Sequence, residues 1–207
     1  MKLKTIKRTK TTSIVLANDE YWGILPDRIL HFYCKGQLEC FEISDEEATK
    51  LLEKIKKLSW NKLLDYLAYR ERSYGECEEF LSKKIFLKEE LQPELLRKAT
   101  SLNFINDRRF AEMLTDDLIR NSKSRVEIKN KLYAKKINEN TISKILQKKF
   151  DSQTANEILE VNLKKAKNRF SGLKKNERNE KILNYLTRKG FTYWEVKEKL
   201  GDKYGRS

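Results

Sequence analysis

One short signature, L-x-x-K-x-(F/I), occurs three times in this 207-residue chain and constrains its fold more than any other feature. The copies are Leu81–Phe86, Leu132–Ile137 and Leu186–Phe191, with first leucines 51 and then 54 residues apart. The first offset also places Leu63 on Leu114. Helical units of this kind stack because one unit alone cannot bury its apolar face. We therefore predict three tandem helical repeats.

The middle repeat shows how its helices are specified. Phe110, Leu114 and Leu118 recur at i, i+4 and i+8, which is the apolar stripe of an amphipathic helix. Ser124 and Glu127 then form an S-x-x-E capping box, in which each side chain accepts a hydrogen bond from the other residue's amide, so a second helix begins there. The same box occurs at Ser44 with Glu47, Ser73 with Glu76, and Thr192 with Glu195.

The first 59 residues follow a different pattern. Two β-prone runs, 12–16 and 21–25, flank Ala17–Glu20 and predict a hairpin, with a further short strand near 31–33 or 38–43. Residues 1–10 carry five basic groups and no acid, which indicates a flexible arm or an edge strand.

These patterns predict a mainly α fold. We expect an N-terminal module with a β-hairpin and a helix over residues 1–59, followed by repeats over 60–106, 107–151 and 152–207 that form an elongated solenoid. Pro93 lacks an amide, so it either begins the third helix of the first repeat or bends it. The basic stretch 164–178 around Gly172 is expected to be irregular.

The net charge of +14 is unevenly distributed. Residues 107–150 hold 12 basic and 6 acidic residues and residues 151–207 hold 14 and 8, whereas residues 1–50 hold eight of each. A localised excess of this kind favours a polyanion or an acidic partner. The alternative interpretation is a solvated, lysine-rich surface.

Several classes of protein are disfavoured by the composition. No apolar run reaches the roughly 18 residues of a membrane span, and the N-terminus lacks the apolar segment of a secretory signal. Cys34, Cys40 and Cys77 make neither an even disulfide framework nor a C-x-x-C pair, which is typical of a reducing compartment. We therefore expect a cytoplasmic protein. We also expect it to be a monomer.

Motifs for catalysis are lacking as well. The sequence contains neither glycine-rich phosphate-binding motif, and its only histidine is His31. Asp116 and Asp117 are adjacent, and neighbouring helix residues point about 100° apart, so the two rarely bind one metal ion. We predict no enzymatic activity, no cofactor and no metal. The alternative is a metal-dependent nuclease built on these two aspartates.

Three segments carry a resemblance to a known family: LLDYLAYRERSYGECEEFLSKK, NDRRFAEMLTDDLIRNSKSRVEIKNKLYAKKI and ILNYLTRKGF. They resemble the RecX family of regulators of the recombinase RecA. The most specific match is the start of the middle repeat, with Asn106, Asp107 and Arg109–Ala111, and the Y-R-x-R-S turn matches at Tyr69–Ser73. The resemblance covers about residues 60–200. Pro93, the insertion around Gly172, and Tyr74-Gly75 depart from the family pattern.

The resemblance implies an elongated, nine-helix protein that binds the RecA–single-stranded-DNA filament in its helical groove. Family members usually inhibit strand exchange and filament growth, and so moderate recombination, DNA repair and the SOS response. The basic composition leaves an alternative open, a helical protein whose main ligand is DNA or RNA itself.

The candidate contact residues are basic, because arginine and lysine pair with phosphate and carboxylate groups. Arg109 has a second interpretation, an ion pair that holds its repeat together. Phe86, Ile137 and Phe191 are expected in packing between repeats. The candidates for filament or DNA binding are Arg70, Arg72, Lys84, Arg108, Arg109, Arg120, Lys123, Arg125, Lys129, Lys135, Lys136, Arg188 and Lys189.

Overall fold

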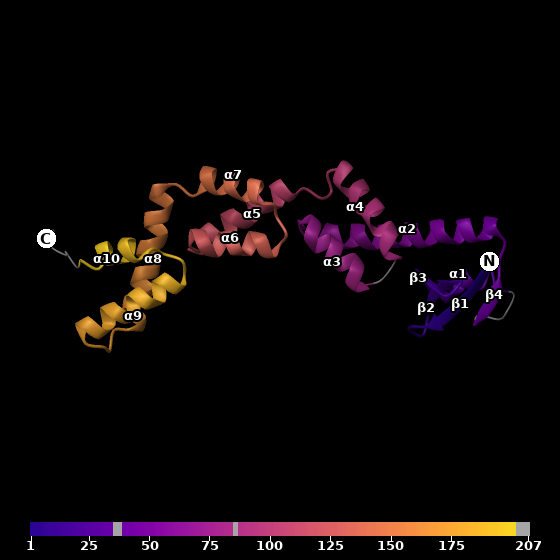
Figure 1. Ribbon diagram of the computed structural model, residues 1–207, viewed down its shortest axis with the longest axis horizontal. Coiled ribbons are helices and arrows are strands. Elements are labelled where there is room, and N and C mark those ends of the chain that lie inside the picture. The colour runs from indigo at the N-terminus through magenta and orange to yellow at the C-terminus, as the bar shows by residue number, and fades with distance from the viewer. Residues whose placement is uncertain (35–38, 85–86, 202–207) are drawn as a thin grey trace. The chain divides into compact units, whose positions relative to one another are not determined.

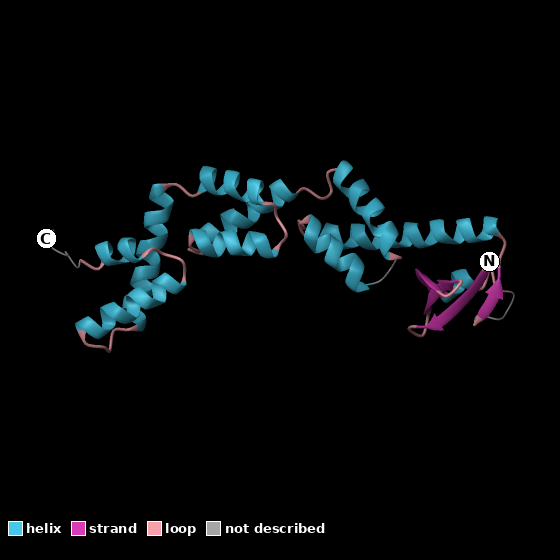
Figure 2. Cartoon of the chain, in the orientation of Figure 1, coloured by secondary structure: helices cyan, strands magenta, loops and turns pink. Residues whose placement is uncertain are grey.

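The computed structural model describes residues 1–34, 39–84 and 87–201, without the side chain of Lys84 (Figure 1). The chain divides into two compact units, Met1–Asn106 and Asp107–Ser207. Each unit has its own apolar core, made by residues from Leu3 to Ile105 in the first and from Phe110 to Val196 in the second. The strands belong to the first unit, and helices dominate both, so the predicted mainly α class is confirmed (Figure 2).

The first unit contains a four-stranded antiparallel sheet in the order β3-β2-β1-β4. Strands β2 (Thr12–Ala17) and β3 (Glu20–Pro26) form the predicted hairpin, with β1 (Lys2–Lys7) and β4 (Cys40–Glu42) beyond β2. Asn18 and Asp19 both have positive φ, 50° and 66°, which suits a two-residue turn between twisted strands. The strand β4 confirms the second of the two predicted positions.

The expectation that residues 1–10 form a flexible arm or an edge strand is wrong. Strand β1 lies between β2 and β4 and is hydrogen-bonded to both. Leu3 is fully buried in the core of the first unit, and the terminal ammonium group of Met1 donates to the Ile43 carbonyl at 2.8 Å. The central position depends on pairing with residues that follow 36 to 40 positions later, which a local charge pattern does not reveal.

Helices complete the first unit. They are α1 (Asp27–Leu30), α2 (Asp45–Tyr69), α3 (Tyr74–Lys84), the 3-10 turn η1 (Glu89–Leu91) and α4 (Gln92–Ser101). The Ser44 capping box begins α2. Pro93 lies in the first turn of α4, one residue after the helix begins, so it does not bend the helix.

Helix α2 also crosses the predicted module boundary at residue 59 without interruption. Its buried stripe continues through Ile55, Ser59 and Leu63, and its N-terminal half lies beside the sheet (Figure 1). Helix α2 therefore contacts the sheet and is also part of the first helical group, which consists of α2, α3 and α4. The repeat boundaries stay a prediction.

The second unit contains two groups of three helices in its described residues. Helix α5 (Asp107–Arg120) packs against α6 (Arg125–Ala134) and α7 (Glu139–Lys149), and α9 (Lys175–Arg188) packs against α8 (Ser152–Arg169) and α10 (Tyr193–Lys199). The stretch 164–178 is less irregular than expected, because only residues 170–174 lie outside a helix.

The repeated L-x-x-K-x-(F/I) signature is a helix ending. The amide of Ile137 donates to the Leu132 carbonyl, and that of Phe191 to the Leu186 carbonyl, both at 3.2 Å. The residue directly before the donor has a positive φ in both copies, 59° at Lys136 and 90° at Gly190. This is the Schellman motif, and the first and last signature residues of both copies belong to the buried core of the second unit. In the first copy Leu81 is buried, and Phe86 lies outside the described residues.

Candidate functional site

In the first unit, Arg70 is held by a carboxylate of its own chain. Its two terminal nitrogens lie 2.8 and 3.0 Å from the Glu76 carboxylate, and one also donates to the Glu71 carbonyl at 2.7 Å. The hydrogen bonds to Glu76 raise the pKa of Arg70. Glu76 is itself buried and completes the Ser73 capping box, so Arg70 stabilises the turn between α2 and α3.

Arg72 is positioned differently. Its guanidinium carbon lies 4.1 Å from the centre of the Tyr66 ring, and that ring stacks on Phe80 at 4.1 Å with an angle of 3°. Within the described residues Arg72 makes no ion pair, and its Nε is buried without a hydrogen-bond partner. The cation–π contact fixes the side chain and leaves its charge uncompensated. The side chain of Lys84 lies outside the described part of the chain.

Several of the predicted cations in the second unit have a carboxylate partner nearby. Such ion pairs at the surface contribute only about 0–1 kcal/mol, so a phosphate or carboxylate of a partner can replace them. The pairs are Arg108 with Glu112 at 3.3 Å, Arg120 with Asp117, Lys123 with Glu127 at 3.5 Å, and Lys129 with Glu139 at 3.0 Å.

The other predicted cations of this unit differ in their surroundings. Arg125 and Arg188 are exposed and make no ion pair within the described residues, although the Arg125 guanidinium lies 6.0 Å from the Phe150 ring centre. Arg109 and Lys135 are half-buried, and Lys136 is exposed at the end of α6. Arg125 and Arg188 are therefore the predicted cations of this unit that the described chain leaves uncompensated.

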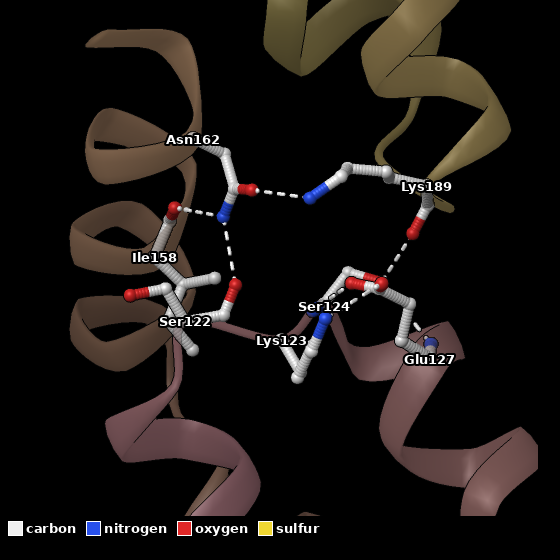
Figure 3. A network of polar contacts seen from close by, with 7 residues as sticks. All are labelled: Ser122, Lys123, Ser124, Glu127, Ile158, Asn162 and Lys189. Atoms are coloured by element: carbon white, nitrogen blue, oxygen red, sulfur yellow. Dashed lines mark hydrogen bonds and ion pairs between the residues drawn. The ribbon is translucent and has the colours of Figure 1, made fainter. Parts of the chain in front are cut away.

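Lys189 belongs to a polar network that joins the two helix groups of the second unit (Figure 3). Its ammonium group donates to Asn162 Oδ1 at 3.0 Å, and its carbonyl accepts from the Ser124 hydroxyl. Asn162, almost fully buried on α8, donates to the carbonyls of Ser122 at 2.8 Å and Ile158 at 2.9 Å. Lys189 is thus engaged inside the protein, at the join between the α5–α6 turn and the end of α9.

Gly190, the residue after Lys189, packs closely against Val126 at the same place. A Cβ atom on Gly190 would lie 2.4 Å from the Cβ of Val126, in the first turn of α6. Only glycine permits this approach, and it also accommodates the φ of 90° that ends α9.

Sequence analysis did not select three lysines of α7 that the structure brings close to Arg108. Lys144, Lys148 and Lys149 line a groove between α5 and α7 of about 180 Å³. The i, i+4 spacing of Lys144 and Lys148 was a usable signal for a shared face. The packing of α7 on α5 was needed to connect them with a residue more than 30 positions earlier.

The described residues contain no group of three or more His, Cys, Asp or Glu side chains that could hold a metal ion. Their helices also include none with the length and apolar character required to cross a bilayer.

Comparison with known proteins connects this chain to one family. Residues 106–146 match the model of "RecX, second three-helix domain". The regulatory protein RecX of Listeria monocytogenes serovar 1/2a is 26% identical, over 93% of this chain and 72% of that protein. A crystal structure of RecX from Lactobacillus salivarius is 27% identical, with a TM-score of 0.61 over 73% of this chain and 96% of that one. A second crystal structure, of a regulatory protein RecX, has a TM-score of 0.68 over 97% of both chains at 23% identity and supports the fold.

Proposed function

The chain belongs to the RecX family, and from that premise we propose that it regulates a RecA recombinase by binding the RecA–single-stranded-DNA filament. Its relatives are described as regulatory proteins, which names a regulatory role and not a catalytic one. In this proposal the protein acts as a cytoplasmic monomer that inhibits ATP hydrolysis and strand exchange by RecA. It thereby moderates recombination, DNA repair and the SOS response.

The observation that carries the proposal is the character of helices α5–α7, which include most of the segment that matches the family model. Apolar residues of these helices, such as Ile128 and Leu132, form part of the buried core of the second unit. Their surface carries most of the 12 basic residues found between positions 107 and 150, against 6 acidic ones. A stable scaffold with a strongly basic surface suits a filament assembled on DNA.

A second function has support of its own. Arg125 and Arg188, with Lys144 and Lys148, carry charges that no carboxylate of the described chain balances. Uncompensated cations also suit a protein whose main ligand is DNA or RNA itself.

The experiment that separates the two functions is DNA-dependent ATP hydrolysis by the cognate RecA on single-stranded DNA, with this protein titrated in at moderate salt. We expect inhibition at concentrations well below those that coat the same DNA in the absence of RecA. Inhibition that begins only when bare DNA is saturated would instead favour the direct nucleic-acid binder.

A further inference from the structure

The groove between α5 and α7 is lined by side chains of both helices. Arg108 and Glu112 come from α5, and Ile145, 4% exposed, lies among the α7 residues. The remaining lining residues are Thr141, Lys144, Lys148 and Lys149 of α7. Four cations therefore surround one carboxylate.

Two of these cations have structural partners. The Lys149 ammonium group lies 2.5 Å from the Asp116 carboxylate and 3.2 Å from the Glu112 carbonyl, so it anchors α7 to α5. Arg108 reaches the Glu112 carboxylate through its Nε at 3.3 Å. For Lys144 and Lys148, in contrast, the described residues supply neither a hydrogen bond nor an ion pair.

Repulsion between Lys144 and Lys148 destabilises α7, and no carboxylate of the described chain offsets it. Lys144 and Lys148 are four residues apart on one helix, where like charges destabilise the helix. Thr141 lies on the same face, three residues before Lys144, and within the described chain its hydroxyl makes no hydrogen bond. The two ammonium groups repel each other, and neither they nor the Thr141 hydroxyl has an acceptor within the described chain. An anionic ligand in the groove would accept hydrogen bonds from these groups and offset the repulsion.

We propose that this groove binds backbone phosphates of single-stranded nucleic acid. Lysine binds phosphate as a point charge, and side chains at i and i+4 are about 5–6 Å apart at their Cβ atoms, so the pair can contact neighbouring phosphates. The described lining has no aromatic ring on which a base could stack, so the contact is independent of base sequence. The proposal rests on the proposed function in one respect, that the strand is the DNA inside the filament.

The test uses one double variant that carries both Lys144→Gln and Lys148→Gln, and compares it with the wild type. Binding of a labelled oligo(dT) without RecA is followed by fluorescence anisotropy over a range of salt concentrations. Each phosphate contact on a single strand contributes about 0.7 to the slope of log K against log salt, so the double variant should lose about 1.4. Between about 50 and 200 mM salt, the advantage of the wild type should then shrink about sevenfold.

The matched control is Lys164→Gln with Lys167→Gln on α8. It removes the same charge from the same unit, from two exposed lysines outside the groove. The control should keep the wild-type slope, and thermal melting should show that both variants are folded. Equal losses in the groove variant and the control would overturn the proposal, because they would show a diffuse effect of net charge.

RecA provides the arm that separates this proposal from the proposed function. If the groove variant binds oligo(dT) normally but inhibits RecA poorly, the groove takes an acidic surface of the filament protein and the phosphate proposal is wrong. If the wild-type protein leaves RecA unaffected, the proposed function fails, while the oligo(dT) measurement still decides on the groove.

Discussion

Gly190 lies where one methyl group would force apart the end of α9 and the start of α6. Gly190→Ala should destabilise the second unit in two ways, through the strain of a positive φ and through overlap with Val126. Overpacking costs about 1–3 kcal/mol and the backbone strain adds to it. Urea denaturation measures the loss.

Gly201→Ala is the control, because Gly201 also has a positive φ, 76°, but open space around its Cβ position. It reports the backbone strain alone. Equal losses for the two variants would show that the approach of Gly190 to Val126 contributes nothing.

Asn162 is the residue through which α8 is joined to the α5–α6 turn. Asn162→Ala should cost about 1–3 kcal/mol, because it leaves the Ser122 carbonyl and the Lys189 ammonium group without their buried partner. Asn168→Ala, at an exposed position of the same helix, should be nearly neutral. A small effect of the first substitution, measured by denaturation, would mean that water replaces the amide.

Asp27 makes the first unit sensitive to acid. Burial by itself raises the pKa of Asp27, but hydrogen bonds from Lys7 and Ser13 outweigh it and lower the pKa below its usual value. The unfolded chain therefore binds more protons near pH 4, and the stabilisation is present above the unfolded pKa of about 3.9 and lost as the pH falls below it.

Asp27→Asn provides the comparison for this pH dependence. The difference in unfolding free energy between wild type and variant should be largest near neutral pH and shrink below pH 4. A difference that stays constant from pH 6 to pH 3 would show that the pKa is not shifted.

At the scale of helices, the sequence was most informative where one element is specified by its own residues. The boxes at Ser44, Ser124 and Thr192 begin α2, α6 and α10, because the cap and its partner are three residues apart. These three helix starts were therefore visible in the sequence. The central place of β1 was not, because its partner β4 is distant in sequence and three residues long.

The candidate site was less predictable than the elements that carry it. Basic residue types on α5 and α6 could be selected, but not which of them a carboxylate compensates, as Glu76 does for Arg70 across six residues. The lysines on α7 needed a packing arrangement, and the role of Lys189 needed a partner 27 residues earlier. Whether a basic side chain is free to bind a partner therefore depends on the tertiary structure around it.

The end of α5 and the start of α6 form the segment whose charge reversal best tests filament binding. Arg120→Glu with Arg125→Glu should weaken inhibition of RecA and leave melting nearly unchanged, because both residues are exposed and the Arg120–Asp117 pair contributes about 0–1 kcal/mol at most. Lys164→Glu with Lys167→Glu on α8 is the charge-matched control. A sharp drop in melting temperature would instead assign the arginines a structural role.

At the scale of the molecule, the two cores have no residue in common among those that the structure describes, so their stabilities should be separable. Leu132 is fully buried in the second core, and Leu132→Ala should destabilise that unit by about 2–5 kcal/mol. In a Trp194→Phe background, tryptophan fluorescence reports the first unit alone, through Trp22 and Trp60.

We expect Leu132→Ala to move the circular-dichroism transition of the second unit and to leave the fluorescence transition unchanged. Met113→Ala, at an exposed apolar residue of the same unit, is the control. A joint shift of both transitions would show that the units unfold as one.

The polar network of Ser122, Ser124, Asn162 and Lys189 also determines where this chain can be exchanged with that of a relative. A chimaera joined at residues 106 and 107 keeps both cores and the whole network within single parents. A chimaera joined at 151 and 152, between the second and third helical groups, would pair the Ser122 carbonyl of one parent with whatever the other carries at position 162. In a chimaera, the helical groups α5–α7 and α8–α10 should therefore come from the same parent.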